Sequence, residues 1–308
     1  MGSPVYPERD AMSAITWDPG TIFLLIMSGL SRASILFIVA AGLTLVFGVL
    51  RVINMAHGSL YMVGAFVAAS VIQQVGGGGG FWLALVAAPL AVALVGAVIE
   101  FGVLRRIYQA EHVVQLLATY ALILIFDDLV KMIWGAEYKS VSVPAAFAGS
   151  ISFGDRPFPI YNLFVILWAL VLAAGLWCLI YRTGLGRLIR AAVEDPEMLE
   201  ALGVNIPRIF SAVFILGAFL AGLGGVLVAP LGSIGLGMDV TILIEAFVVA
   251  VIGGLGSFPG ALLGAGIIGM MFSFGITVAP RMAMAFVFLA MVIVLIVRPW
   301  GLFGEPER

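Results

Sequence analysis

The sequence predicts an all-α protein that crosses a membrane several times. Of its 308 residues, 63% are hydrophobic and 10% are charged, and the mean hydropathy is +1.19, far outside soluble globular usage. Apolar runs of about 18 residues or more follow one another, each long enough to cross a hydrocarbon core. The alternating apolar and polar strands of a β-barrel do not appear in the sequence, so helices must satisfy the backbone within lipid.

Nine apolar stretches, separated by polar segments, give the order of the elements. Residues 1–21 lack the apolar core of a signal peptide and are predicted to be an N-terminal tail, residues 22–304 a single transmembrane domain and residues 305–308 a C-terminal tail. We predict spans near residues 22–50, 54–75, 82–104, 113–134, 160–181, 209–230, 242–256, 259–276 and 283–298. The seventh and eighth are short enough to be half-spans, which predicts eight or nine transmembrane or partly re-entrant helices.

The longest polar interruption, residues 182–208, is predicted to form two short helices that face water. Residues 185–193 have an amphipathic pattern. Asp195 suits the cap of a second helix, Pro196 its first position, and Gly203 a left-handed stop. So defined a loop indicates a docking site for a cytoplasmic partner. The alternative is a solvated connector whose charges keep it out of the bilayer.

The distribution of Lys and Arg predicts which loops face the cytoplasm. With residues 182–208 inside, nine of these cations fall inside and five outside. Residues 135–159 then form an extracytoplasmic loop, and the carboxyl terminus lies inside. The amino terminus lies outside, unless one half-span is re-entrant, in which case it lies inside.

Two glycine-interrupted stretches, residues 48–64 and 253–269, occupy corresponding places in the two halves of the chain. Paired interruptions of this kind are typical of pseudo-symmetric transporters with a pathway near the midplane. Glycine is also common in ordinary membrane helices, so a true internal repeat and a chance pairing both stay open.

Each interruption has a functional and a structural interpretation. Asn54 and His57, in the first, must be hydrogen-bonded if buried in the membrane, and they either tie down the broken helix or contact solute. The second is either a tight turn between spans or part of a pathway, because glycines permit unusual backbone angles and proline suits a resuming helix. The candidate residues there are Gly253, Gly254, Gly256 and Pro259.

Charged residues within the predicted spans are candidates for function, because a charge in the bilayer is costly. Arg32 and Glu245 have no obvious partner in the sequence. Glu100 lies about one turn from Arg105 and is expected to extend to the cytoplasmic surface.

A second acidic group lies near the outer end of the fourth span. Asp127 and Lys131 are four residues apart, so an ion pair on one helical face is expected. Asp128 points elsewhere on the helix, and we expect it either to lie at the interface or to line a pathway.

Several classes of site have no support in the sequence. Cys178 is the only cysteine and the chain has two histidines without ligand spacing, so we predict neither a disulfide within the chain nor a metal site. The glycine-rich stretches lack the lysine of a P-loop, and the sequence has no GxSxG or HExxH motif, so we predict no catalytic residue and no cofactor. No basic patch indicates nucleic acid.

Four blocks, in order, carry a resemblance to a known family. They are VINMAHGSLYMVGA (residues 52–65), GRLIRAAVEDPEMLEALGVN (186–205), AFVVAVIGGLGSFPGALLG (246–264) and RPWGLFG (298–304). The chain resembles the permeases of high-affinity branched-chain amino acid ABC importers, of the LivH type, over nearly its whole length.

The resemblance implies an import machine of several chains in the bacterial inner membrane. Its other parts would be a second permease, usually an unlike, LivM-like chain, two ABC ATPase subunits that hold ATP and Mg, and a periplasmic solute-binding protein. Residues 182–208 would then contain the coupling region that contacts an ATPase. The candidate coupling residues are Gly186, Arg190, Glu194, Asp195, Leu202 and Gly203.

The resemblance specifies the machine more closely than its cargo. Relatives of this type often have lysine where this chain has Glu245, and related permeases handle other amino acids, short amides, urea or aromatic acids. A rival hypothesis is an ion-driven secondary carrier or channel, which would transport a small solute without ATPase partners.

Overall fold

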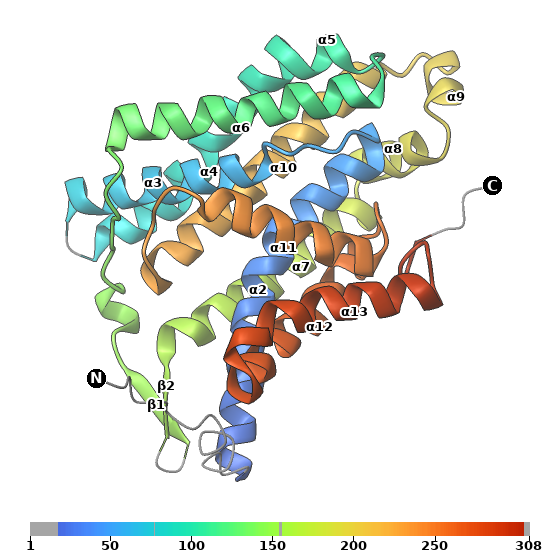
Figure 1. The fold of residues 1–308 in the computed structure, drawn as a ribbon. Coiled ribbons are helices and arrows are strands. Elements are labelled where there is room, and N and C mark those ends of the chain that lie inside the picture. Colours follow the sequence, from blue (N-terminus) through green and yellow to red (C-terminus); the bar gives the residue numbers. More distant parts are fainter. Residues whose placement is uncertain (1–17, 77, 154–155, 305–308) are drawn as a thin grey trace, which may run out of the picture.

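The computed structural model describes residues 18–76, 78–153 and 156–304, and most of them are helical (Figure 1). The long helices are α2 (Pro19–Leu50), α3 (His57–Val75), α4 (Gly79–Ile99), α6 (His112–Trp134), α7 (Ile160–Arg182), α10 (Ile206–Val228), α11 (Met238–Gly253), α12 (Phe258–Val278) and α13 (Ala283–Val297). The short elements are η1 (Glu100–Leu104), α5 (Arg105–Ile107), η2 (Ala145–Phe147), β1 (Ser150–Phe153), β2 (Arg156–Pro159), α8 (Gly184–Glu194), α9 (Pro196–Ala201), η3 (Ala229–Leu231) and η4 (Pro280–Met282). The predicted all-α polytopic fold is confirmed.

Within these ranges, eight helical segments are long and apolar enough to cross a membrane. They contain α2, α3, α4, α6, α7, α10, α12 and α13. Of the two predicted half-spans, only the seventh is short: α11 has 16 residues, fewer than the roughly 20 that a full crossing needs, whereas α12 has 21.

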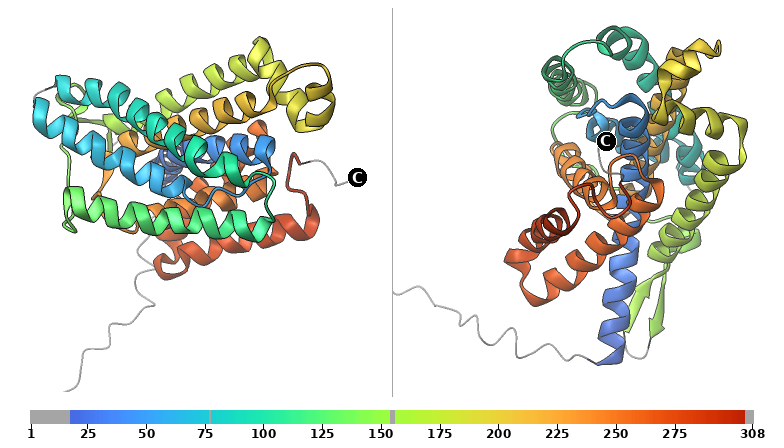
Figure 2. Two further views of the ribbon diagram at one scale, coloured as in Figure 1. Left: turned by 90° about the horizontal axis from the view of Figure 1, so that it is seen from above. Right: turned by 90° about the vertical axis from the view of Figure 1, so that its right-hand side faces the viewer.

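The long helix α2 is the centre of the structure, with α12 and α13 on one side of it and α7 on the other (Figure 2). In its most apolar 18-residue window, 89% of the residues are buried, against 17% in the last span. Small side chains let its neighbours approach closely, since Ala33, Ala40 and Ala41 are all buried. A helix so enclosed needs no polar face, which agrees with its mostly apolar sequence, in which Arg32 is the one charged residue.

Helices α3 and α10 pack closely through glycines. A Cβ atom on Gly64 would lie 2.6 Å from the Cα of Gly222, so a larger residue would push the helices apart. Lipid gives helices little hydrophobic reason to associate, and close van der Waals packing of this kind takes its place.

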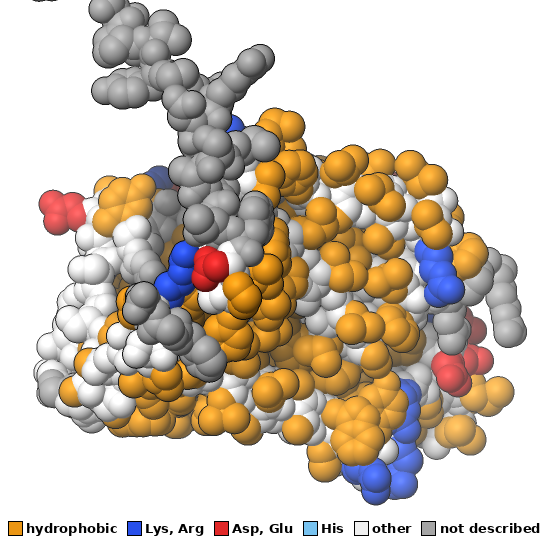
Figure 3. Space-filling model, turned by 90° about the horizontal axis from the view of Figure 1, so that it is seen from below, with side chains coloured by type: hydrophobic (Ala, Val, Ile, Leu, Met, Phe, Trp, Pro, Cys, Tyr) orange, Lys and Arg blue, Asp and Glu red, His pale blue; other side chains and the backbone are white. Residues whose placement is uncertain are grey.

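Polar segments lie at two opposite ends of the molecule. The end of α2, the α5–α6 connection, α8, α9 and the C-terminal segment lie together at the right in Figure 1, and the hairpin side lies opposite. Hydrophobic side chains cover most of the face in Figure 3, where the largest groups of Lys and Arg side chains lie toward one end. The arrangement is that of a bundle whose ends face water and whose flanks face lipid.

Two local boundaries differ from prediction. Helix α2 begins at Pro19, not at residue 22, because Asp18 and Pro19 form a helix start. In the 135–159 loop, β1 and β2 form an antiparallel hairpin with Ile151 opposite Phe158. Residues 1–17 and 305–308, predicted as tails, lie outside the described residues.

Candidate functional site

The second helix of the 182–208 loop is closed at each end by the groups that the sequence predicted, and the first has a cap that was not predicted. Asp195 Oδ1 accepts a hydrogen bond from Met198 N at 2.9 Å, and Pro196 occupies the first turn of α9. Gly203 has a φ of 84°, the left-handed conformation that ends the helix. Thr183 Oγ1 caps α8 by accepting from Gly186 N at 3.1 Å. The loop therefore has a fixed shape before any partner binds.

Two of the six coupling candidates attach α8 to α7 instead of pointing outward. Arg190 donates to the carbonyl oxygen of Ile180, and its guanidinium lies over the ring of Tyr181, 5.2 Å from the centroid. Gly186 is buried against the last turn of α7, where a side chain would collide with backbone. These contacts fix the orientation of the short helices relative to a membrane-spanning helix.

The outward surface of the loop is acidic with apolar tips. Leu202 is 72% exposed and Met198 60%, although both belong to residue types that are usually buried. The exposed residues around them are Glu194, Asp195, Glu197, Glu200 and Gly203. We define this set, with Met198 and Leu202, as the α9 surface. Its composition suits a partner that offers a basic groove with an apolar floor.

The first glycine interruption is an irregular segment between α2 and α3. Arg51 ends α2 in the left-handed conformation, with a φ of 53°. His57 Nε2 donates to the carbonyl oxygen of Val39 at 3.0 Å, and Asn54 Oδ1 accepts from Ala56 N at 3.1 Å. Both side chains are buried, so these contacts agree with the interpretation that they tie down a broken helix.

The second interruption is a tight turn between α11 and α12. Gly254 and Gly256 have φ values of 101° and 87°, which only glycine adopts readily. Ser257 Oγ accepts from Gly260 N at 3.2 Å, and Pro259 lies in the first turn of α12. Gly253 ends α11, and its carbonyl oxygen accepts a hydrogen bond from Phe303 N at 2.9 Å.

Two of the four sequence blocks, residues 246–264 and 298–304, meet at this turn. Leu302 N donates to the carbonyl oxygen of Ile252 at 2.9 Å, so the RPWGLFG segment closes over the end of α11. The backbone of Gly48, near the end of α2, contacts Gly256. The turn between α11 and α12 is thus held to both the first interruption and the carboxyl terminus.

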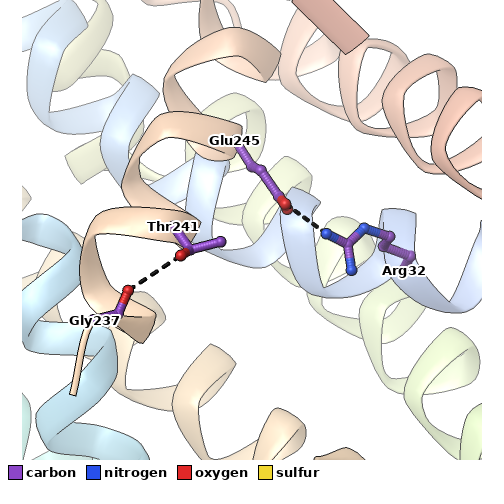
Figure 4. Close-up of polar contacts among 4 residues, drawn as sticks. All are labelled: Arg32, Gly237, Thr241 and Glu245. Atoms are coloured by element: carbon purple, nitrogen blue, oxygen red, sulfur yellow. Dashed lines mark hydrogen bonds and ion pairs between the residues drawn. The ribbon is translucent and has the colours of Figure 1, made fainter. Parts of the chain in front are cut away.

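Arg32 and Glu245, which had no obvious partner in the sequence, pair with each other. Arg32 Nη2 of α2 lies 2.5 Å from Glu245 Oε1 of α11 (Figure 4). The guanidinium also lies over the ring of Phe272 from α12, 3.5 Å from the centroid. The pair therefore joins three helices around a charge that is compensated within the membrane.

Glu100 does not extend to the surface as expected, because it has better partners inside. It is fully buried at the start of the π-helix η1, and its Oε1 accepts hydrogen bonds from Ser211 Oγ and Tyr108 OH, both at 2.8 Å. Burial, and then this bond, raise the pKa of the Tyr108 phenol well above its usual value, so the phenol stays protonated as a donor. Both bonds fall on Oε1, whereas Oε2 is buried without a hydrogen-bond partner in the described part of the chain.

The expected pairing of Asp127 with Lys131 is wrong. Lys131 Nζ bonds Asp128 Oδ1 at 3.2 Å on the exposed side of α6. Asp127 turns inward instead, and its Oδ1 is buried without a hydrogen-bond partner in the described part of the chain. Spacings of three and four residues both allow an ion pair on a helix, and the exposed face decided between them. Asp128 is thus paired with Lys131 on the exposed face of α6, which favours the interface position over a place along a pathway.

Comparison with known proteins identifies the family. A family model described as "Branched-chain amino acid transport system / permease component" matches residues 25–296. The chain belongs to this permease family. It is 29% identical over 295 residues to BraD of Pseudomonas aeruginosa, a high-affinity branched-chain amino acid transport system permease protein, covering 92% of this chain and 95% of that one.

Other relatives of the permease agree. LivH of Escherichia coli K12 is 30% identical over 303 residues, covering 91% of this permease and 94% of LivH. The fructose import permease protein FrcC of Rhizobium meliloti is 31% identical over 144 residues, but covers only 44% of this chain and 39% of its own. No solved structure matches. The resemblance inferred from the four blocks is confirmed, and the chain is a multi-pass membrane permease.

Sequence reasoning missed two features of the permease's interior. Nothing local joins Arg32 to Glu245, because 213 residues separate them. The contact of Glu100 with Ser211 spans 111 residues and was equally invisible. Met198 was also missed on the α9 surface, although its place among capped, charged residues could have indicated an exposed position. No group of three or more His, Cys, Asp or Glu side chains in the described ranges has metal-binding geometry.

Proposed function

We propose that this permease is the membrane-spanning subunit of an ATP-driven importer that translocates branched-chain or related amino acids across the bacterial inner membrane. The family match over residues 25–296 carries this proposal, because the named relatives are permeases of amino acid transport systems. A chain with this match and no P-loop needs its energy from another subunit.

Two ATPase subunits, which hold ATP and Mg, are the proposed partners on the cytoplasmic side, and the α9 surface is the proposed contact. A second permease, most plausibly an unlike chain of the LivM type, would complete the pathway. A periplasmic solute-binding protein would deliver solute on the side of the β1–β2 hairpin.

Motion of the ATPases would enter the membrane through α7 and α10. Helix α8 is bound to α7 through Arg190 and Gly186, and Asn205 caps α10 directly after the loop by accepting from Arg208 N at 3.1 Å. Helix α10 packs on α2, α3 and α4. Displacement of the loop would therefore shift the helices around both glycine interruptions and open the path to one side at a time. Among the candidate pathway residues, we propose Glu245 as the first to test.

Purification from native membranes tests the proposal. We expect the tagged chain to retain an ATPase, and the charge reversal Glu197→Arg on the α9 surface to reduce its recovery. Glu137→Arg is the matched control, because it reverses an equally exposed charge in the 135–159 loop on the opposite side.

Retention of the ATPase by Glu197→Arg and loss by Glu137→Arg would reverse the proposed orientation. A chain that is recovered alone and transports solute down an ion gradient would instead be the carrier of the rival hypothesis.

A further inference from the structure

We propose that Arg32 and Glu245 bind the zwitterionic end of an amino acid on the translocation pathway, Arg32 holding the carboxylate and Glu245 the ammonium group. This inference rests on the proposed function, because it names contacts that the solute makes within the permease. The starting observation is the 2.5 Å pair between α2 and α11 shown in Figure 4.

Both residues lie deep in the bilayer. Thirteen residues separate Arg32 from the start of α2 and eighteen from its end, and Glu245 is seven and eight residues from the two ends of α11. At about 1.5 Å per residue, Arg32 is about 20 Å from the nearer end of its helix, and Glu245 about 10 Å from either end of α11. Neither side chain belongs to the polar ends of the molecule.

Arg32 is nevertheless open on one side. Its side chain is 34% exposed, against 5% for Glu245. Of its five N–H donors, one is bonded to Glu245, and Nε is buried without a partner in the described part of the chain, so the exposed donors are those of the two terminal nitrogens. The Phe272 ring covers one face of the guanidinium, but a ring accepts no ordinary hydrogen bond. A guanidinium exposed at this depth must face a polar partner and not lipid.

The chemistry of the pair selects the class of that partner. The guanidinium fork suits a carboxylate, with two parallel hydrogen bonds. Arg32 reaches Glu245 at one oxygen, Oε1, which leaves the second oxygen for an ammonium group. The pair is neutral as a whole, so a zwitterion can join it without adding net charge to the bilayer. A simple amine or a simple carboxylic acid would leave one charge uncompensated.

The neighbouring surface suits an aliphatic side chain. The Phe272 ring lies against the Arg32 guanidinium and gives an apolar surface next to the ion pair. Thr241, one turn before Glu245, is exposed, and its hydroxyl donates to the carbonyl oxygen of Gly237 at 3.1 Å (Figure 4). A zwitterionic head at the ion pair and an apolar tail against Phe272 describe an amino acid with an apolar side chain.

Protection of a cysteine from alkylation tests the site without the binding protein or ATP. Thr241→Cys is placed in a Cys178→Ser background and the complex is embedded in lipid nanodiscs. We expect leucine to slow alkylation of Cys at position 241 by N-ethylmaleimide. Isoamylamine, which lacks the carboxylate, and 4-methylpentanoate, which lacks the ammonium group, should give no protection. The control is the unchanged chain, in which Cys178 is exposed on α7; leucine should not change the alkylation rate of this native cysteine.

Substitutions of the pair separate recognition from structure. Arg32→Gln or Glu245→Gln should raise the leucine concentration needed for protection at least about thirtyfold, because one charge of the zwitterion loses its partner. The double variant Arg32→Gln with Glu245→Gln leaves no unpaired charge, so it should fold and still lose protection.

Three results would overturn the site: leucine fails to protect, either analogue protects as well as leucine, or the double variant is protected like the unchanged chain. The last would mean that the pair only holds α2 against α11. Failure of the proposed function looks different, because the unchanged complex would then show no ATP-dependent leucine uptake at all.

Discussion

Glu100 and Glu245 are both buried acidic residues of the membrane domain, but their surroundings are opposite. Glu100 is fully buried and accepts hydrogen bonds from two neutral hydroxyls on neighbouring segments. Glu245 is paired with a cation whose side chain is one-third exposed. The first contact is closed to any ligand, whereas the second leaves donors free. Exposure and the charge of the partner, more than the presence of a charge in the bilayer, separate a structural role from a transport role.

The closed contact has its own place in the mechanism. Ser211 lies in the second turn of α10, directly after the 182–208 loop, and Tyr108 follows α5. The ring of Tyr108 also meets that of Phe210 edge-on at 5.5 Å. Glu100 therefore holds the beginning of α10 to the end of α4, and the two would move together when the loop is displaced.

The largest effect on stability should come from removing the Glu100 side chain, which holds Ser211 and Tyr108. Glu100→Ala leaves the Tyr108 hydroxyl without its acceptor and opens a cavity, which should cost about 3 kcal/mol. The thermal midpoint of the purified complex, followed by size-exclusion chromatography after heating, measures the loss. Glu100→Gln should lower the thermal midpoint much less, because its amide oxygen still accepts both hydroxyl bonds.

Tyr108→Phe should give a smaller loss of stability at the same contact. It removes one of the two bonds to Glu100 and keeps the ring packing, so a loss of about 1 kcal/mol is expected. Equal thermal midpoints for Glu100→Ala and the unchanged chain would show that the closed contact holds nothing together and would remove the contrast between the two glutamates.

The smallest effect on stability should come from an exposed ion pair at the end of the molecule that carries the β1–β2 hairpin. Asp18 accepts a hydrogen bond from Thr21 Oγ1 and pairs with Arg156 at 3.0 Å. The Thr21 bond, and then the charge of Arg156, hold the pKa of Asp18 below its ordinary value. A lowered pKa contributes stability above the unfolded value, and this contribution is lost as the pH falls through the folded value.

Acidification below a pH of about 4 should therefore loosen the start of α2 from β2. Hydrogen exchange of the hairpin amides, compared between the unchanged chain and Asp18→Asn, measures this. The two should differ at neutral pH and converge in acid, and salt should reduce the difference. A difference that persists in acid would exclude titration of Asp18 as its cause.

Local signals were enough to predict much of this structure. The caps of the coupling loop, from Asp195 to Gly203, depend on residues within a few positions of one another, and the structure has each of them. The spans followed from apolar length, except that α11 is too short to cross the bilayer. The hairpin was missed because residues 135–159 were predicted as a loop without strands.

Contacts between distant helices could not be predicted from one sequence. Arg32 and Glu245 looked unpaired, and Glu100 was expected to extend to water, because tertiary packing alone supplies their partners. The choice of Asp128 over Asp127 as the partner of Lys131 also depended on which face of α6 is exposed. Burial, unlike capping, is a property of the whole fold.

ATP-dependent uptake of leucine into proteoliposomes tests the central claim most directly. The chain is reconstituted with its partner permease, the ATPases and the binding protein. We expect uptake only with hydrolysable ATP, its loss in Glu245→Gln while ATP hydrolysis continues, and its retention in Glu100→Gln, whose amide oxygen still accepts both hydroxyl bonds. Uptake by the chain alone, driven by an ion gradient without ATP, would contradict the importer, and undiminished uptake by Glu245→Gln would contradict a transport role for the open pair.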